Sequence, residues 1–167
     1  MKVQEINREE LLEFIAKAHR NTYAAPGEIR QKHRCKVPIL SGHKDYEFVD
    51  GLWRYHDSYA GRILAPGSEV VFFKDVPVWR MSYQSMPDES LSESYYQNCV
   101  FPFLRRALTA FKDDCPFRGL NGFTEPEYSF QYNFQIRGDY KYFTGQEIIE
   151  DCGREVFFQD VMGALIK

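Results

Sequence analysis

The sequence predicts an α+β fold in which a curved antiparallel sheet, made of two related β-meander repeats, packs against two helices. Apolar and polar residues alternate strictly over 128–137, which is typical of a half-buried strand. Apolar residues recur at helical spacing over 8–20 and again within 92–112. The half-repeats, about 43–84 and 128–162, share aromatic and glycine positions, which indicates an internal repeat.

The composition is that of a single globular domain spanning 1–167. The chain is 44% hydrophobic and 27% charged, and at its length of 167 residues a domain buries roughly 70% of its unfolded surface. Its net charge of -3 gives no basic field for phosphate backbones, so we expect no direct nucleic-acid binding. No stretch approaches the ~20 apolar residues of a membrane span. No signal-peptide core is present either, so we expect a cytoplasmic protein with no membrane contact.

The first helix is predicted over about 8–20. Asn7 is a suitable N-cap residue, with Glu10 three positions later as in a capping box. The helix should end near Asn21, because Ala24-Ala25-Pro26-Gly27 breaks the apolar pattern. The basic segment 28–40 lacks periodicity, and we interpret it as an exposed loop, with contact to an anionic ligand as the alternative.

The first hairpin is predicted from Asp50-Gly51, a dipeptide typical of two-residue turns with positive φ at both positions. Counting outward from this loop opposes residues of opposite charge across the two strands, which supports the register. These pairs are Glu47 with Arg54, Asp45 with His56, and Lys44 with Asp57.

Two further hairpins and a second helix complete the predicted fold. The helix within 92–112 should kink or restart at Pro102, because proline has no amide hydrogen to donate. The hairpins pair 69–73 with 78–83 around 74–77, and 146–149 with 155–161 around 151–153.

Asp57 breaks the pattern that the two halves share. Glu69 aligns with Glu147 at an offset of 78 residues, and one loop before it differs in length by a residue. Aligning Gly61 with Gly138, at an offset of 77, places the preceding strands in phase, and Asp57 then falls on Phe134. A carboxylate on an otherwise aromatic face costs several kcal/mol unless it is paired. We therefore predict that Asp57 either forms a buried pair with Lys44 or contacts a ligand.

Two other polar groups are candidate sites with simpler alternatives. Glu69 and Glu147 either accept hydrogen bonds from turn amides or act as an acid and base pair on a glycosidic bond. The second role requires their carboxyl groups to lie within roughly 5 to 10 Å of each other. His43, Asp45 and His56 share one face of the first hairpin. They are either exposed cross-strand polar pairs or ligands for iron or zinc. The simpler interpretation is preferred in both cases, so we predict no catalytic residue, metal or other cofactor.

Aromatic residues of the sheet form either plain core or an apolar pocket closed by the second helix. Arg118, near the turn before the long strand, is the candidate for holding a ligand carboxylate, with loop stabilisation as the alternative. The predicted ligand-contacting residues are Tyr55, Asp57, Tyr59, Glu69, Trp79, Tyr83, Arg118, Tyr132 and Glu147.

The chain also resembles a family of uncharacterised bacterial domains that often follow an XRE-type helix-turn-helix in predicted transcriptional regulators. The resemblance covers nearly the whole chain and rests on Asn21-Thr22-Tyr23-Ala24, Ser41-Gly42-His43, Tyr55-His56-Asp57-Ser58-Tyr59, Gly67-Ser68-Glu69-Val70-Val71, Pro77-Val78-Trp79, Met81-Ser82-Tyr83, Arg118-Gly119 and Phe143-Thr144-Gly145-Gln146-Glu147-Ile148. It departs from the family pattern at Ser82 and at Gly163-Ala164. The resemblance implies a small α+β sensor-like domain and brings no established activity.

These observations lead us to expect a small-molecule-binding, sensor-like domain with an aromatic pocket. The first alternative is a small hydrolase-like enzyme that uses the paired glutamates or the His43 cluster. The second is a protein–protein interaction domain that pairs through exposed sheet edges, with homodimer formation left open.

Overall fold

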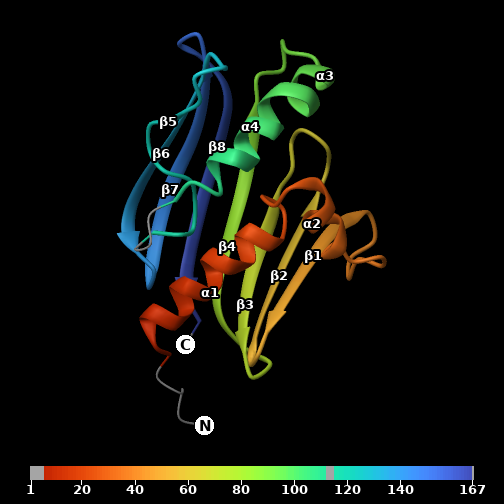
Figure 1. The fold of residues 1–167 in the computed structure, drawn as a ribbon, viewed down its shortest axis with the longest axis vertical. Helices are drawn as coiled ribbons and strands as arrows, with labels where there is room; N and C mark the ends of the chain where they lie inside the picture. Colours follow the sequence, from red (N-terminus) through yellow and green to blue (C-terminus); the bar gives the residue numbers. More distant parts are fainter. Residues whose placement is uncertain (1–5, 112–114, 167) are drawn as a thin grey trace.

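The computed structural model describes residues 6–111 and 115–166, which form one eight-stranded sheet with helices α1 and α4 on the same face (Figure 1). The helices are α1 (Arg8–Asn21), α2 (Gly27–Lys32), α3 (Glu93–Tyr95), the π-helix η1 (Tyr96–Val100) and α4 (Phe101–Ala107). The strands are β1 (His43–Asp50), β2 (Trp53–Ala60), β3 (Gly67–Phe73), β4 (Val76–Pro87), β5 (Phe123–Thr124), β6 (Phe130–Asp139), β7 (Tyr142–Asp151) and β8 (Arg154–Leu165). A sheet-rich α+β fold is therefore confirmed.

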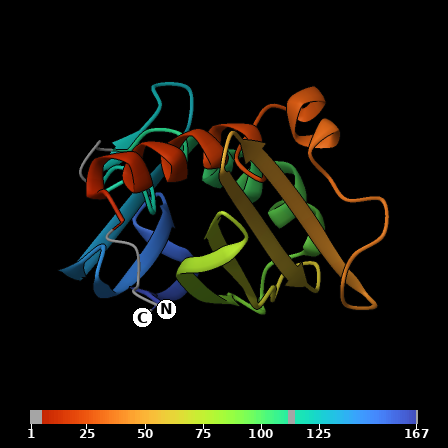
Figure 2. The same ribbon diagram turned by 90° about the horizontal axis from the view of Figure 1, so that it is seen from below.

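All neighbouring strands of the sheet are antiparallel, in the order β1-β2-β3-β4-β8-β7-β6-β5. The meander β1–β4 meets the meander β6–β8 where β4 pairs with β8, from Trp79 opposite Leu165 to Pro87 opposite Phe157. Strands of the two meanders cross at a steep angle in Figure 2, so the sheet is strongly twisted and α1 lies across it. In the described residues, no helix is long and apolar enough to cross a membrane.

Helix α1 begins where the capping pattern predicts. The side-chain oxygen of Asn7 accepts hydrogen bonds from the backbone amides of Glu9 (2.8 Å) and Glu10 (3.4 Å), which satisfies two of the amides that a helix start leaves unpaired. Its buried stripe consists of Leu11, Leu12, Phe14, Ile15, Ala18 and His19. The last of these, His19, is polar, and it is buried where α1 packs on the sheet.

The predicted register of the first hairpin is wrong by two residues. Asp50 pairs with Trp53, so the turn is Gly51-Leu52, and of these two residues only Gly51 has a positive φ (59°). Turns with glycine at the first central position match strand twist as well as the Asp-Gly turn does. A shift of two leaves every side chain on its predicted face, but it places Asp57 opposite Tyr46 instead of Lys44.

The charge pairs of this hairpin survive the shift in part. Arg54 still lies 3.6 Å from Glu47, as a diagonal neighbour. His56 Nε2 likewise lies 3.1 Å from the Asp45 carboxylate. The predicted pairing of Asp57 with Lys44 is wrong, and the amine of Lys44 instead donates to the carbonyl of Gly61 (3.3 Å).

Two other segments differ from their predictions. The basic segment that we interpreted as a loop contains the six-residue helix α2. The second helix is divided into α3, η1 and α4, and Pro102 lies in the first turn of α4, directly after the π-helix η1, where the hydrogen-bond pattern of the helix changes. The other two hairpins turn through positive-φ pairs, Lys74-Asp75 and Cys152-Gly153, within the predicted turn segments.

Glu69 and Glu147 have matching neighbours in the two meanders. Glu69 pairs with Asp57 on one side and Met81 on the other, and Glu147 pairs with Phe134 and Gln159. The registers thus follow the alignment of the two halves, while the interpretation of these halves as an internal repeat stays a prediction.

The outer edge of β1 is partly covered by the segment that follows α2. The amide of Cys35 donates to the carbonyl of Asp45 and the amide of Glu47 donates to that of His33, both at 2.9 Å. These bonds occupy backbone groups that an exposed edge strand would offer to another chain.

Candidate functional site

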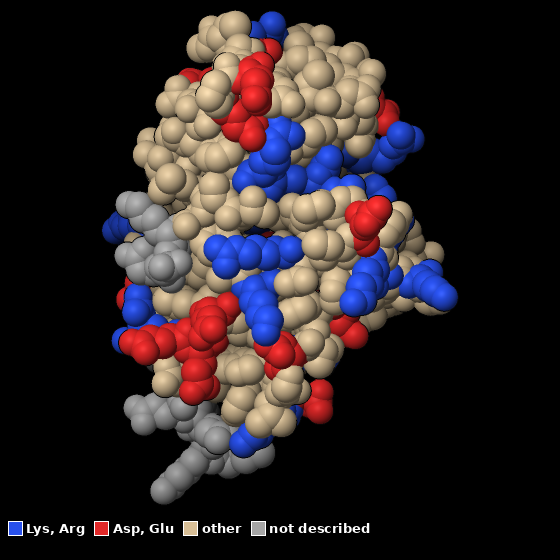
Figure 3. All heavy atoms as spheres, viewed as in Figure 1, with Lys and Arg blue, Asp and Glu red and all other residues tan. Residues whose placement is uncertain are grey.

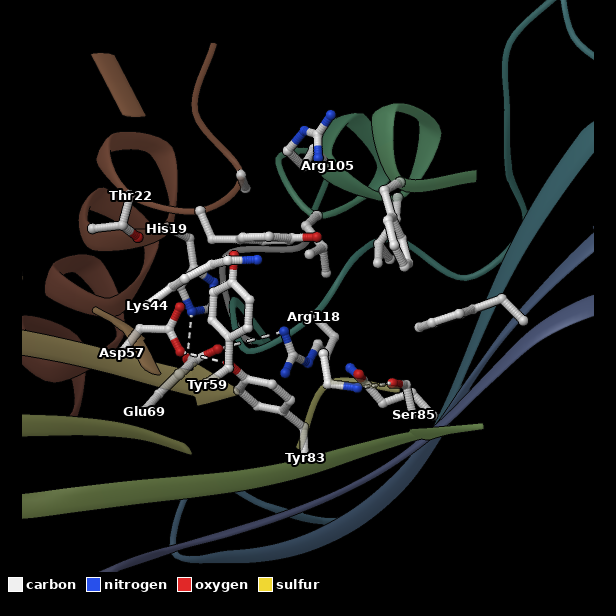
Figure 4. A pocket seen from close by; sticks show the side chains of 18 of the residues that line it. His19, Thr22, Lys44, Asp57, Tyr59, Glu69, Tyr83, Ser85, Arg105 and Arg118 are labelled. Carbon is white, nitrogen blue, oxygen red and sulfur yellow. Dashed lines mark hydrogen bonds and ion pairs between the residues drawn. The ribbon is translucent and has the colours of Figure 1, made fainter. Parts of the chain in front are cut away.

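A pocket with a cavity volume of about 110 Å³ lies between the C-terminal end of α1, helix α4 and strands β2, β3 and β4 (Figure 4). Its apolar and aromatic wall contains Tyr23, Tyr55, Tyr59, Ile63, Tyr83, Phe101, Leu104, Leu108 and Phe157. Its acidic and basic lining residues are His19, Lys44, Asp57, Arg62, Glu69, Arg105 and Arg118. The arrangement is an apolar cavity with a few convergent polar groups, as in many ligand-binding sites.

Arg118 is the central polar group of the pocket. Its side chain is 5% exposed and lies 3.5 Å from Glu69 on one side and 3.5 Å from Glu147 on the other. Its guanidinium also faces the ring of Tyr83 at 5.2 Å. Burial alone would lower the pKa of Arg118, but Glu147 and Glu69 outweigh it and hold the pKa above its usual value. The guanidinium therefore stays charged.

The ion pairs of Arg118 leave its hydrogen-bonding capacity unused. Within the described residues, Nε and Nη2 of Arg118 are buried and have no hydrogen-bond partner. A guanidinium has five donors, and a buried donor without an acceptor costs about 1 to 3 kcal/mol. Figure 4 shows the Arg118 guanidinium projecting among the side chains that line the pocket.

Glu147 supports Arg118 from behind and does not line the pocket. It is fully buried, and it accepts hydrogen bonds from Tyr132 (2.6 Å) and Gln159 (2.5 Å). The Tyr132 hydroxyl in turn accepts from the amide of Gly119 (3.1 Å). This network holds the segment that carries Arg118 against β6 and β7.

Glu69 stands on the pocket side of Arg118. His19 from α1 lies 2.8 Å from one Glu69 oxygen. Burial would raise the pKa of Glu69, but His19 and Arg118 outweigh it, so the pKa is lowered. The carboxylate is therefore ionised at neutral pH, and it joins α1 to the sheet.

Asp57 lies beside Glu69 on the neighbouring strand and behaves differently. It is buried, and its Oδ1 accepts a hydrogen bond from the Tyr83 hydroxyl at 2.6 Å. Burial and the nearby charge of Glu69 raise the pKa of Asp57 to about 8, although Tyr83 and Arg118 act in the other direction. Asp57 is therefore mostly an uncharged acid at neutral pH, able to donate a hydrogen bond as well as accept one.

Cationic side chains surround the pocket on the helix side of the molecule. Lys44, Arg62 and Arg105 line the pocket from β1, from the β2–β3 connection and from α4. Figure 3 shows Lys and Arg side chains gathered across the middle of this face. Burial lowers the pKa of Lys44, and the nearby positive charges of Arg34 and Arg62 add to this effect.

Six of the nine predicted ligand-contacting residues line this pocket. They are Tyr55, Asp57, Tyr59, Glu69, Tyr83 and Arg118. Tyr132 and Glu147 lie behind Arg118, as described above. Trp79 is fully buried in the core, where it stacks on Phe117 and Phe143, which also stack on each other, and it does not line the pocket.

Sequence reasoning missed the residues that the helices contribute. His19, Tyr23 and Arg105 come from α1, its C-terminal end and α4. His19 carried a signal, since it is the polar member of the apolar stripe of α1. Which strand that stripe would face depends on helix docking, which no local pattern specifies.

The His43 cluster lies on the other face of β1 and β2. Asp45 accepts hydrogen bonds from Ser58 (2.8 Å) and from the amide of Ile39 (2.8 Å), and it contacts His56. His43 Nδ1 lies 2.9 Å from the Ser58 hydroxyl. In the part of the chain that the structure describes, no group of three or more His, Cys, Asp or Glu side chains has an arrangement that would hold a metal ion.

Comparison with known proteins finds one family. A family model described as a domain of unknown function (DUF5680) matches residues 57–166. The match contains Asp57, Glu69, Arg118 and Glu147, whereas His19 lies before it. No curated protein matches the chain, and neither does any solved structure. The expected resemblance to an uncharacterised family is confirmed, and its link to XRE-type regulators stays an expectation.

Proposed function

We propose that this chain, which belongs to the DUF5680 family, is a binding domain for a small molecule that occupies the pocket beside Arg118. The observation that carries the proposal is the buried guanidinium of Arg118, two of whose nitrogens have no hydrogen-bond partner within the described residues. Native structures rarely leave such donors unsatisfied. Because Nε lies 3.5 Å from Glu147, on the side away from the pocket, a ligand oxygen would accept the hydrogen bond that Nη2 lacks.

The chemistry of the pocket defines the inner end of the ligand. Arg118 requires an acceptor, while the mostly protonated Asp57 offers both a donor and an acceptor. Glu69 and Glu147 already balance the charge of Arg118. An uncharged oxygen, such as that of a hydroxyl, carbonyl or amide group, therefore suits the inner end better than a second carboxylate would.

The remaining wall favours a compact apolar body. Phe101, Leu104, Leu108 and Phe157 are apolar lining residues that α4, its C-terminal end and β8 contribute. Enclosed cavities of about 150 Å³ bind benzene, so a cavity of about 110 Å³ that opens to the surface suits a single ring or a short branched chain.

The proposal includes three finer expectations from the sequence. We propose that the two meanders are repeats, and that the replacement of an aromatic residue by Asp57 adapted one of them for binding. We also propose a cytoplasmic, sensor-like role in which ligand binding is passed to a partner. Support for the first is the matching registers of Glu69 and Glu147.

A fragment screen tests the binding function. Protein-observed NMR with a library of small hydroxy, oxo and amide compounds should detect binders that shift the resonances of His19, Tyr59 and Tyr83. The Arg118→Gln variant should weaken these binders about tenfold or more, because a hydrogen bond from a charged donor is worth about 1.5 to 3 kcal/mol.

Two further variants make the screen decisive. Arg80→Gln removes an arginine that is exposed on β4, and it should leave binding unchanged. Asp57→Asn keeps the shape of the site and tests the pocket if Arg118→Gln does not fold. The proposal would be contradicted by binders whose affinity for Asp57→Asn and for Arg118→Gln equals their affinity for the unmodified protein. A library without any binder would contradict it as well.

A further inference from the structure

Three cations at the pocket opening, Lys44, Arg62 and Arg105, have no role in the binding function proposed above. Among the described residues, Arg62 forms an ion pair with Glu93 at 2.6 Å, whereas Lys44 and Arg105 form none. Lys44 lies 5.3 Å from the ring of Tyr59, and Arg105 lies 5.9 Å from that of Tyr23. Both cations thus rest on aromatic walls of the same cavity.

We propose that the ligand is a small organic anion whose charged group binds between Lys44 and Arg105 at the pocket opening while its uncharged end reaches Arg118. This inference rests on the proposed binding function and specifies the charge class of its ligand. The carboxylate or phosphate group of such a ligand would supply the counter-ion that Lys44 and Arg105 lack within the described residues.

The distribution of charge within the pocket gives the ligand its orientation. At the inner end, Arg118 and His19 face Glu69, and Glu147 lies behind. A further anion placed there would meet two carboxylates in a buried environment, which is unfavourable. At the opening, an anion meets only cations among the charged lining residues, Lys44, Arg62 and Arg105. The anionic group therefore points outward.

The positive field at the opening has a second consequence for the ligand. Exposed cations attract anions over a distance of about one Debye length, which is ~8 Å at physiological salt. Anionic molecules would be concentrated at the opening, and cationic ones of the same size would be repelled. In Figure 3, Lys and Arg side chains, the source of such a field, gather in the middle of the helix face.

A matched pair of probes tests the charge class. 4-Hydroxybenzoate carries a phenol at one end and a carboxylate at the other, and 4-hydroxybenzamide replaces the carboxylate with a neutral group of nearly the same shape. Titration calorimetry in 50 mM salt should show the acid binding about fivefold tighter than the amide, the upper range for partly exposed ion pairs. This preference should shrink in 500 mM salt, because screening weakens exposed ion pairs.

Variants locate the effect. Lys44→Gln and Arg105→Gln should each reduce the preference for the acid, and the double variant should abolish it without changing affinity for the amide. Lys141→Gln removes an exposed lysine near the β6–β7 turn, and it should behave as the unmodified protein does.

The outcomes separate this inference from the proposed function. Equal affinity for the two probes would overturn the anion proposal while leaving the pocket as a binding site. Failure of both probes, while a neutral fragment binds in the Arg118 screen, would also overturn it. Absence of binding by both probes and by the whole fragment library would instead refute the proposed function.

Discussion

At the scale of single residues, the pocket depends on two neighbouring carboxyl groups that hold different charges. Asp57 and Glu69 are opposite each other on β2 and β3, yet the pKa of the first is raised and that of the second is lowered. The difference arises because His19 and Arg118 contact Glu69, whereas Asp57 receives its hydrogen bond from the neutral hydroxyl of Tyr83. Because the two pKa values differ in this way, the pair contains one anion, Glu69, and one neutral hydrogen-bond donor, Asp57.

The raised pKa of Asp57 makes stability depend on pH. Burial and Glu69 raise this pKa from 3.8 to about 8. Below about pH 4 both the native and the unfolded states are protonated at this residue. Between there and the native pKa only the native state keeps the proton, so stability falls as pH rises through this window.

Asp57→Asn should remove this dependence. Between pH 5 and pH 8 we expect its free energy of unfolding to fall by about 2 to 4 kcal/mol less than that of the unmodified protein. Urea denaturation across this range measures the difference. Asp75→Asn, whose side chain is 93% exposed, is the control. Parallel pH profiles for Asp57→Asn and the unmodified protein would show that Asp57 is ionised throughout.

At the scale of single elements, strand β3 begins with a glycine that leaves room for two pocket tyrosines. A Cβ atom at Gly67 would lie 2.4 Å from the Tyr83 hydroxyl and 2.7 Å from Cβ of Tyr59. Since both atoms belong to tyrosine side chains, even the methyl group of an alanine at this position would disturb Tyr83, the donor to Asp57.

Gly67→Ala should therefore act on stability and binding together. We expect a loss of about 1 to 3 kcal/mol, as for other overpacked sites, with weaker binding of any fragment that contacts Asp57. Thermal denaturation and NMR titration measure the two effects. Gly27→Ala is the matched control, because nothing lies within 4 Å of a Cβ there. If Gly67→Ala equals Gly27→Ala in both measurements, Tyr83 does not depend on this glycine.

The elements that the sequence predicted well are those with a local cause. The Asn7 cap depends on contacts between residues close in sequence. The alternation in β6 follows from the two-residue period of a strand, and it holds over 130–134, whereas Tyr128 and Ile136, which the pattern placed on the buried side, are exposed. The register of the first hairpin was missed because the glycine of an Asp-Gly pair suits either the first or the second central position of a two-residue turn. The pairing of the two strands decides which position Gly51 takes. The same limit applies to the site. Asp57 was found as an exception to a pattern and Arg118 by its place near the turn before the long strand, whereas Arg105 carried no such signal and was missed.

At the scale of the whole molecule, the family match begins inside β2, and so leaves out α1 and β1. The structure nevertheless uses α1 to cover the sheet and to bring His19 to Glu69. Without this helix, the aromatic face around Tyr55 would be exposed to water, and burial of such a face is the main source of stability.

A chain limited to residues 57–166 should therefore fail to fold cooperatively. We expect dispersed amide resonances and a sharp thermal transition for the full chain, and neither for the shortened one. Circular dichroism and two-dimensional NMR provide the comparison. A shortened chain with a sharp transition and native-like chemical shifts would show that α1 and β1 are dispensable additions.

The position of β8 in the sheet bears on how the protein is made. This strand joins the two meanders through β4, yet it follows every other strand along the chain. During synthesis, at about 5 to 20 residues per second, β1–β4 are complete well before their central partner emerges from the ribosome. The edge of β4 that pairs with β8 therefore stays unpaired during this time. It is then the part of the nascent chain most accessible to chaperones or to pairing with a second nascent copy.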